Sequence, residues 1–587
     1  MGPPFAGMSR RLTLRYRQQS GPGLRRDDPF NQQGRLRLPR HALLHYSWAS
    51  LSGPSLATMS SPPPAQQHPA TYATAIQHAL GLLESGKLGE AEHLCRSILQ
   101  AKPDDFNALH ILGVCANARR AFPEAAVLLG RALATSPNSY EVLVRRGIAL
   151  QALQRFEEAI QHYDRALAVK PDAADAHCNR GNALQAMGKS REAIENYDKA
   201  IALAPRLADA YSNRAVALMA LNRHQEAIDD CGKAIAIRPD FAEAYSNRAY
   251  ALQELGLHQQ AIADCDRATA IKPSYAEANW IKSQSMLSAG LSEAGWKLWE
   301  QRLQTKKYGV LRDFGLPLLG EMAPNSRKLL IQWEQRFGDV IQMLRFVPHL
   351  ESIAGRCYWQ IQEPLSELFV RSFPSARQVA ISECPADAEF RVPITSLPLV
   401  TRTFSEAAIP APVPYLVPDT QRVARSKHEL DSSPVMPTVG IVWRGNPEPP
   451  NRSVPIEHLQ QLFAMSGVRF VSLQREQTAA ESRVLERFPQ TLSLGDTLTS
   501  FDDTAAVIGA VDLVITIDTA IAHLAGALGA TTWVLLKAGA DWRWLLDRGD
   551  SPWYPTARLF RQPRLGDWDT VIARVRAKLA ERYGTPA

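Results

Sequence analysis

The sequence of 587 residues lacks an uninterrupted apolar run long enough to cross a bilayer, and it is poor in cysteine. A spanning helix needs about 20 consecutive apolar residues, so we expect no transmembrane segment. The seven cysteines form no Cys-x-x-Cys pair, which argues against a disulfide framework or a zinc site. Free cysteines are typical of a reducing compartment, and we therefore expect a cytoplasmic protein.

An excess of charge is also missing from most of the chain. The net charge of +7 comes from 66 Lys and Arg against 59 Asp and Glu. Residues 1–58 contain nine arginines and two aspartates and carry the whole excess, because 9 − 2 = 7. Without a cationic cluster elsewhere, we expect no nucleic-acid partner. We interpret residues 1–68 as a disordered tail. A transit peptide and a true translation start at Met59 are the alternatives.

A repeat of 34 residues organises the first half of the sequence. Its proline column is Pro103, Pro137, Pro171, Pro205, Pro239 and Pro273, and one of its alanine columns is Ala91, Ala125, Ala159, Ala193, Ala227 and Ala261. Small residues let two helices approach closely, and proline ends each unit because it cannot continue a helix. The pattern resembles the tetratricopeptide repeat, with about six stacked units and a cap. We assign this α-solenoid to residues 69–305.

Three repeats carry an asparagine at the same position of their first helix, namely Asn179, Asn213 and Asn247. An amide side chain both donates and accepts hydrogen bonds, so a ladder of them can hold a peptide backbone of any sequence. The pattern resembles the asparagine ladder of eukaryotic O-GlcNAc transferase, which implies a protein or peptide partner in the repeat groove. The alternative is that these are exposed polar residues in copies of one repeat.

The second half of the sequence alternates short apolar runs with helical stretches. Strands are predicted at 329–333, 439–443, 470–473, 513–517 and 532–536. Such alternation predicts α/β architecture with parallel sheets. The length suits two Rossmann-like domains that face each other across a cleft, which we place at residues 306–432 and 433–587.

Two acidic positions follow predicted strands, where ligands bind in folds of this kind. Asp339, beside Gly338, can act as a general base toward a hydroxyl group. Asp518 and Thr519 begin a helix whose backbone N–H groups can hold a diphosphate, and His523 lies one turn further on. Helix capping for the two aspartates, and a buried, satisfied histidine, are the alternative interpretations.

Four segments resemble family 9, heptosyltransferase-type glycosyltransferases. Residues 334–342 are similar to the glycine-loop motif that opens the family, and 518–529 are similar to its donor-binding signature. Residues 443–447 with 451–453 match the loop that brings a basic residue to the donor phosphates. Residues 541–555 are typical of a bacterial subgroup that fuses tetratricopeptide repeats to this module.

The resemblance implies a GT-B fold, with the acceptor side at 306–432 and the nucleotide-sugar side at 433–587. It also implies inverting, metal-independent transfer from a nucleotide sugar as co-substrate, without a further cofactor. Asp339 would be the general base. The donor-binding residues would be Gly338, Arg452, Ser453, Asp518, Thr519 and His523.

The repeats would recruit the acceptor, which we take to be a protein. A lipid-linked or polysaccharide acceptor is a second possibility. The alternative function is a non-catalytic interaction scaffold with a degenerate glycosyltransferase domain.

Several residues test this interpretation. Arg336 stands where the related motif usually has glycine, and a positive φ there would strain an arginine. Lys537 stands where the subgroup usually has proline. We interpret Asp567 and the pair at 502–503 as helix caps rather than metal ligands, and expect no metal. The Trp-rich segment 541–554 is expected to pack in the core.

Overall fold

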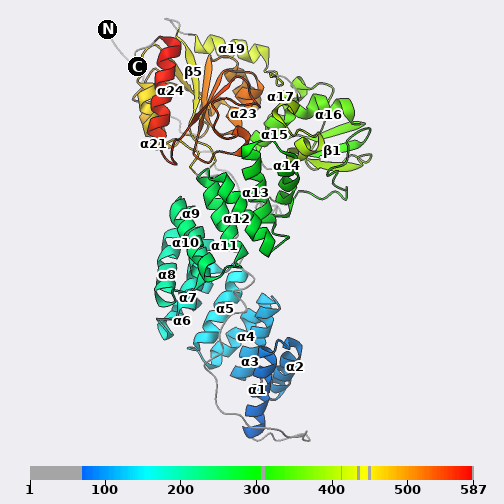
Figure 1. The fold of residues 1–587 in the computed structure, drawn as a ribbon, viewed down its shortest axis with the longest axis vertical. Coiled ribbons are helices and arrows are strands. Elements are labelled where there is room, and N and C mark those ends of the chain that lie inside the picture. The colour runs from blue at the N-terminus through cyan, green and yellow to red at the C-terminus, as the bar shows by residue number, and fades with distance from the viewer. Residues whose placement is uncertain are drawn as a thin grey trace, which may run out of the picture. The chain divides into compact units, whose positions relative to one another are not determined.

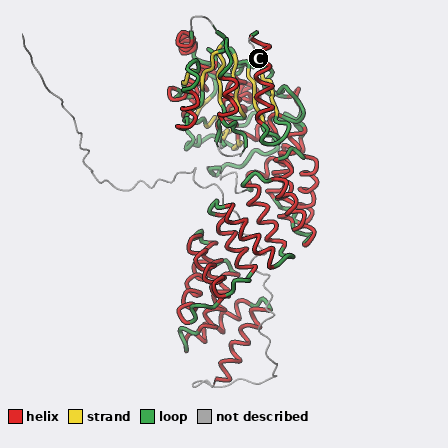
Figure 2. The backbone as a smooth tube through the Cα atoms, turned by 90° about the vertical axis from the view of Figure 1, so that its left-hand side faces the viewer, coloured by secondary structure: helices red, strands yellow, loops and turns green. Residues whose placement is uncertain are grey.

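The computed structural model describes residues 69–305, 311–334, 336–410, 413–431, 436–446 and 451–584. The predicted tail at 1–68 and part of the 443–447 motif lie outside these ranges. Helices alone make up the N-terminal part of the described chain, and all strands belong to the C-terminal part (Figures 1 and 2). Within the described ranges, no helix combines the length and apolarity that membrane crossing requires.

Thirteen helices of the described chain form the repeat array, as six successive antiparallel pairs followed by α13. They are α1 (Pro69–Glu84), α2 (Leu88–Ala101), α3 (Phe106–Ala118), α4 (Phe122–Thr135), α5 (Tyr140–Ala152), α6 (Phe156–Val169), α7 (Ala174–Ala186), α8 (Ser190–Leu203), α9 (Ala208–Ala220), α10 (His224–Ile237), α11 (Ala242–Glu254), α12 (His258–Ile271) and α13 (Ala276–Ala289). Each repeating proline comes just after the capping residue of a second helix, as Pro103 follows Lys102 after α2. The alanine column is fully buried, which confirms the predicted solenoid of helix pairs.

The two helices of a repeat fit through a matched pair of residues 16 positions apart. A Cβ on Gly147 would lie 2.5 Å from Cε1 of Tyr163, so a large ring requires glycine opposite it. In a later repeat Ala215 replaces the glycine, and the smaller Cys231 replaces the tyrosine; both are fully buried in one cluster. A larger residue at one position is thus accompanied by a smaller residue at the other, as close packing requires.

The array ends in a cap formed by α14 (Glu293–Trp299) and the short 3-10 helix η3 (Glu300–Gln304). Trp296 and Trp299 are 0% and 1% exposed and lie in one hydrophobic cluster with α13 and the first sheet. The cap therefore joins the repeats to the α/β region through a common core.

The first sheet has four parallel strands in the order β3-β2-β1-β4. They are β1 (Lys328–Gln332), β2 (Arg356–Gln360), β3 (Arg377–Val379) and β4 (Phe390–Pro393). Their connections contain α15 (Phe337–Met343), α16 (Val347–Ile353) and α17 (Glu363–Ser372), and α18 (Leu397–Val400) follows β4. The chain moves outward from β1 to β3 and then returns to the other side of β1, which makes the end of β1 a topological switch point.

The second sheet has six parallel strands in the order β10-β9-β8-β5-β6-β7. They are β5 (Thr438–Val442), β6 (Arg469–Ser472), β7 (Leu492–Ser493), β8 (Leu513–Ile517), β9 (Thr532–Leu536) and β10 (Ala557–Arg561). The helices are α19 (Thr420–Leu430), α20 (Ile456–Phe463), α21 (Ala479–Leu485), α22 (Phe501–Ile508), α23 (Ala520–Ala527) and α24 (Trp568–Tyr583). Separate apolar clusters cover the two faces of the sheet, and the strand order reverses between β5 and β8.

The five predicted strands correspond to β1, β5, β6, β8 and β9 within one residue, so the expectation of α/β architecture with parallel sheets is confirmed. Sequence reasoning missed the other five, of which β3 and β7 are short and β2 begins with a charged residue. Asp567 caps α24 by accepting from the Thr570 amide, as predicted. The N-cap of α22 is Ser500 instead, and Asp503 completes its capping box from the first turn.

Candidate functional site

The loops after β1, β5, β8 and β9 bring the predicted site residues together. Asp339 follows β1, Arg452 follows β5, and Asp518 directly follows β8. These strands flank the switch points of the two sheets, where a parallel α/β fold leaves a crevice at its carboxyl edge. Two positions 179 residues apart, Asp339 and Asp518, thus belong to one region because helices α15 and α23 pack against each other.

The contact between α15 and α23 depends on a glycine. A Cβ on Gly338 would lie 2.9 Å from Cδ2 of His523 and 3.6 Å from Cα of Ala520. The preceding Arg336 has φ −126° and ψ 142°, which is extended backbone open to any residue. The strain that a positive φ would impose on Arg336 is therefore absent.

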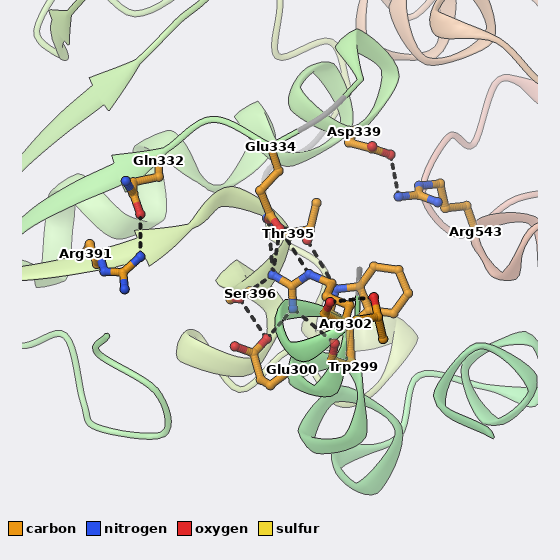
Figure 3. Close-up of polar contacts among 11 residues, drawn as sticks. Trp299, Glu300, Arg302, Gln332, Glu334, Asp339, Arg391, Thr395, Ser396 and Arg543 are labelled. Carbon is orange, nitrogen blue, oxygen red and sulfur yellow. Dashed lines mark hydrogen bonds and ion pairs between the residues drawn. The ribbon is translucent and has the colours of Figure 1, made fainter. Parts of the chain in front are cut away.

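Asp339 lies in the first turn of α15 and forms an ion pair with Arg543, which follows β9 (Figure 3). An Nη atom of Arg543 donates to Oδ1 of Asp339 at 2.6 Å, its Nε donates to Gln342 at 2.7 Å, and its other Nη donates to Asp541 at 2.7 Å. Burial raises the pKa of the Asp339 carboxyl, and the positive charge of Arg543 opposes that rise. The carboxylate is thus held in place by a cation that also limits its proton affinity.

Arg452 reaches the end of β8 from the loop after β5. Its Nη1 donates to the backbone oxygen of Asp518 at 3.0 Å, and its Nε donates to the Asn446 oxygen at 3.2 Å. A Cβ on Gly445 would lie 2.9 Å from that Nε, so the guanidinium passes directly over a glycine. Ser453 supports the same loop by accepting from the Gly445 amide at 3.2 Å.

The Asp518 carboxyl is largely enclosed, and its surroundings favour proton uptake. Burial raises its pKa, and the nearby charge of Asp541 raises it further. Asp541 itself has a lowered pKa: burial alone would raise it, but the charge and hydrogen bonds of Arg543 outweigh burial. Thr519 is the N-cap of α23 and makes no side-chain capping bond, so its hydroxyl is not used to close the helix.

His523 is uncharged, and its ring borders this site. Burial and the positive charge of Arg543 lower its pKa to about 3. Its Nδ1 lies 2.9 Å from the Tyr554 hydroxyl, and its ring stacks on Trp544 with centroids 5.5 Å apart. Its Nε2 lies 3.9 Å from the Asp518 carboxylate. The buried-histidine interpretation fits its environment, and the ring still borders the acidic site.

Sequence reasoning missed Asp541 and Arg543 because it treated residues 541–554 as one packing segment. The tryptophans of the segment do pack: Trp542 and Trp544 are 1% and 0% exposed. The arginine between them, Arg543, bonds to Asp339, and Asp541 bonds to Arg543. A usable signal was the alternation of charged residues and tryptophans at 541–544, in the loop that follows a predicted strand.

A buried polar network anchors the loop that leads to Asp339 (Figure 3). Glu334 is 3% exposed and accepts two hydrogen bonds from Arg302, each 3.1 Å long. Thr395 donates to the same carboxylate through its backbone N–H at 2.8 Å and its hydroxyl at 2.7 Å. Since Arg302 belongs to the repeat cap, the solenoid helps to position the candidate base.

Lys537 makes a second connection between the repeats and the site. Its Nζ lies 2.5 Å from Glu254 at the end of α11, and both side chains are almost fully buried. A Cβ on Gly539 would lie 2.3 Å from the Glu254 carbonyl oxygen, so the chain after β9 rests directly on that helix end. The lysine at a position where proline was expected therefore has a specific partner in the last repeats.

Asparagines predicted to hold a peptide already form hydrogen bonds within the repeat array. Asn213 donates to Asn182 at 2.9 Å, and Asn247 donates to Ser212 at 3.1 Å. Asn179 is 7% exposed. The amide donors thus tie the first helix of one repeat to that of the preceding repeat, which leaves peptide binding by these residues a prediction.

Comparisons with known proteins identify the repeats. Family models described as TPR repeat or tetratricopeptide repeat match residues 76–140, 149–188, 174–207, 208–241 and 242–275. The chain contains tetratricopeptide repeats. Such arrays are scaffolds for protein interaction.

A curated relative is Protein FlbA of Caulobacter vibrioides, which is 27% identical over an alignment of 324 residues that covers 50% of this chain and 54% of FlbA. The chain thus spans about half the length of the curated relative that it matches. Among solved structures, MamA is 25% identical, with coverage of 28% of this chain and 97% of MamA and a TM-score of 0.26. A tetratricopeptide repeat protein from Parabacteroides merdae is 18% identical, covers 39% of this chain and 91% of its own, and has a TM-score of 0.35.

In the described part of the chain, no group of three or more His, Cys, Asp and Glu side chains is arranged to hold a metal ion. The charges of the site are balanced instead by guanidinium groups. Its carboxylates are Asp339, Asp518 and Asp541, and its arginines are Arg336, Arg452 and Arg543. Two of those arginines have fixed hydrogen bonds, which is suited to binding a diphosphate.

Proposed function

We propose that the chain is a cytoplasmic glycosyltransferase with two Rossmann-like halves of the GT-B type. It would move a sugar from a nucleotide-sugar donor to an acceptor recruited by the repeats, with inversion and without a metal. The observation that carries the proposal is the convergence of Asp339, Arg452 and Asp518 at the switch points of two parallel sheets. None of these three residues is near another in sequence.

In this reaction Asp339 accepts the proton of the acceptor hydroxyl, because its raised pKa makes it a better base than an exposed aspartate. The acceptor oxygen forms a bond to the anomeric carbon, and the bond from that carbon to the diphosphate oxygen breaks. The nucleoside diphosphate leaves with the bonding electrons.

The charge that develops on the diphosphate is stabilised by cations already in place. Arg452 is held by two backbone oxygens, and Arg543 is held by two carboxylates and Gln342. Cations fixed before the reaction stabilise the transition state without reorganisation. Asp518 binds hydroxyls of the donor sugar. Gly338 has no side chain, which lets the His523 ring pack closely against α15.

The second candidate is an interaction scaffold whose α/β region binds a nucleotide sugar without turning it over. The repeats favour this function, since interaction is what such arrays do. The ion pair between Asp339 and Arg543 also favours it, because a base that stays paired cannot reach an acceptor.

The experiment is nucleoside diphosphate release by the full chain from UDP-, GDP-, ADP- and dTDP-sugars, with and without lysate as acceptor source. Asp339→Asn is the test variant. Asp567→Asn, at a helix cap outside the site, is the matched control. We expect acceptor-dependent release from one donor, reduced about 10²–10⁴-fold in Asp339→Asn and unchanged in the control.

Calorimetry separates the two candidates. Donor binding without release in the parent protein would favour the scaffold. If no donor binds at all, both the transferase and the nucleotide-sugar scaffold are wrong.

A further inference from the structure

An arginine column runs through the repeats at intervals of 34 residues: Arg146, Arg180, Arg214 and Arg248. The positions 16 residues before and after each arginine lie on the second helices of two successive repeats, and in three cases at least one of them is an aspartate. Arg180 bonds to Asp164, Arg214 bonds to Asp198 and Asp230, and Arg248 bonds to Asp264. These carboxylates neutralise three of the four guanidinium groups.

Arg146 differs from the other three. The positions 16 residues before and after it hold Gly130 and His162, neither of which carries a negative charge. Within the described ranges, Arg146 forms no ion pair, and its Nε is buried without a hydrogen-bond partner. A Cβ on Gly130 would lie 3.2 Å from its Cζ, so the guanidinium occupies the place of the missing carboxylate side chain. Burial and the charge of Arg146 lower the pKa of His162 to about 4, which keeps that ring neutral.

Arg146 lines an open groove of about 550 Å³ along one face of α4. The α4 residues of the groove are Pro123, Ala126, Val127, Gly130, Arg131 and Ala134, with Arg146, Leu153 and Arg155 opposite. Val127 is 64% exposed, which is unusual for a large apolar side chain. The two outer arginines are already paired, Arg131 with Asp104 and Arg155 with Glu158.

The corresponding faces of several later repeats carry acidic residues where α4 has Val127 or Gly130. The position of Gly130 is taken by Asp164 and Asp198 in the next two repeats. The position of Val127 is taken by Glu195 and Asp229 two and three repeats later. The α4 face therefore combines an exposed apolar surface with an arginine that lacks the aspartate bonded to Arg180, Arg214 and Arg248.

We propose that this groove binds an acidic peptide segment of a partner protein, with one carboxylate on Arg146 and a neighbouring apolar side chain on Val127. Charge complementarity selects this occupant: the bound carboxylate takes the place that an aspartate fills in the other repeats. Bidentate, charge-assisted hydrogen bonds from the guanidinium to the carboxylate give specificity. The apolar surface of the groove adds buried contact area. This binding site is independent of the proposed glycosyl transfer.

The test uses the full chain and a short fluorescent peptide built from Leu and Glu, with fluorescence anisotropy as the measurement. A peptide with Gln in place of Glu is the ligand control. His162→Asp is the sharpest variant, because an aspartate there reproduces the bonds that Asp230 and Asp264 make to their arginines. Arg146→Gln removes the cation, and Arg180→Gln is the matched control at the same position of the next repeat.

We expect the Leu/Glu peptide to bind the parent protein and Arg180→Gln alike, and to bind Arg146→Gln and His162→Asp about tenfold or more weakly. His162→Asp should also raise the thermal midpoint, which shows that the variant is folded and that Arg146 gained a partner. Equal binding of the Leu/Gln peptide, full binding by His162→Asp, or no saturable binding by the parent would each overturn the proposal.

Discussion

Charged pairs in the repeat array and in the α/β region use the same chemistry over very different distances along the chain. Arg248 pairs with Asp264, only 16 residues away, and the same spacing returns in the neighbouring repeats. Asp339 pairs with Arg543 across 204 residues, and Lys537 pairs with Glu254 across 283. The repeats are thus stabilised unit by unit, whereas the candidate site exists only when the whole chain has folded.

The two kinds of pair also differ in exposure. Arg223 and Glu226 on the repeats have side chains 46% and 55% exposed, whereas Arg302 and Glu334 are 0% and 2% exposed. Water screens the first pair, and the second must be neutralised by its partner. Breaking an exposed pair such as Arg223–Glu226 should therefore have little effect, and breaking a buried pair such as Arg302–Glu334 a large one.

The largest effect is expected for Arg302→Met, which leaves Glu334 as a buried charge without its cation. We expect the free energy of unfolding to fall by about 3–5 kcal/mol. Chemical denaturation of the full chain measures it, with Lys297→Met as a control in the same cap, where the ion pairs are exposed. A loss no larger than that of the control would remove the distinction between the two kinds of pair.

A smaller effect is expected at the matched residues inside a repeat. Gly147→Ala places a methyl group 2.5 Å from Tyr163 and should destabilise by about 1–3 kcal/mol. Combining it with Tyr163→Cys reproduces the Ala215–Cys231 combination of a later repeat. The double variant should therefore lose less stability than the sum of the single variants, as a double-mutant cycle measures. Strict additivity would show that the two positions are not coupled.

The pH dependence of stability tests the Asp339–Arg543 pair. Arg543 opposes the rise of the Asp339 pKa, so Arg543→Gln lets that pKa rise further. A carboxyl whose pKa is raised by folding destabilises the folded state when it is ionised, and this penalty disappears as the pH falls through its pKa. Arg543→Gln should therefore lose stability at neutral pH and recover it toward acid.

The control for that experiment is Arg543→Gln combined with Asp339→Asn, which lacks the Asp339 carboxyl but keeps Asp541, the other carboxylate bonded to Arg543. Chemical denaturation across the acid range compares the two proteins, and the difference between them is the contribution of Asp339. If the recovery toward acid is equally large in the double variant, Asp541 or another group causes it and the pair does not govern Asp339.

The smallest effect is expected for Arg223→Gln, which breaks the exposed pair with Glu226 on α10. Solvent screening and side-chain entropy leave such pairs near neutral, so the denaturation midpoint should not change measurably. A clear loss would mean that the array also depends on its surface pairs.

Much of the fold could be predicted because its signals are local. The spacing of Pro103, Ala91 and their copies gives the helix pairs, and five apolar runs give β1 of the first sheet and the four inner strands of the second. β7 and β10 could not be predicted in the same way, since edge strands are short or carry charges and owe their conformation to a neighbour. The same holds for Asp541 and Arg543, whose segment looks like packing until β9 directs it toward Asp339.

The sequence by itself determined the repeat, because each unit of 34 residues contacts only its neighbours and must repeat what those contacts need. It also determined which residue types follow the strands. Only the tertiary structure decided that Asp339, Asp518 and Arg543 meet and that Lys537 pairs with Glu254. Those outcomes depend on how two parallel sheets and the last repeats pack, since a charge acts on what lies near it in space and not in sequence.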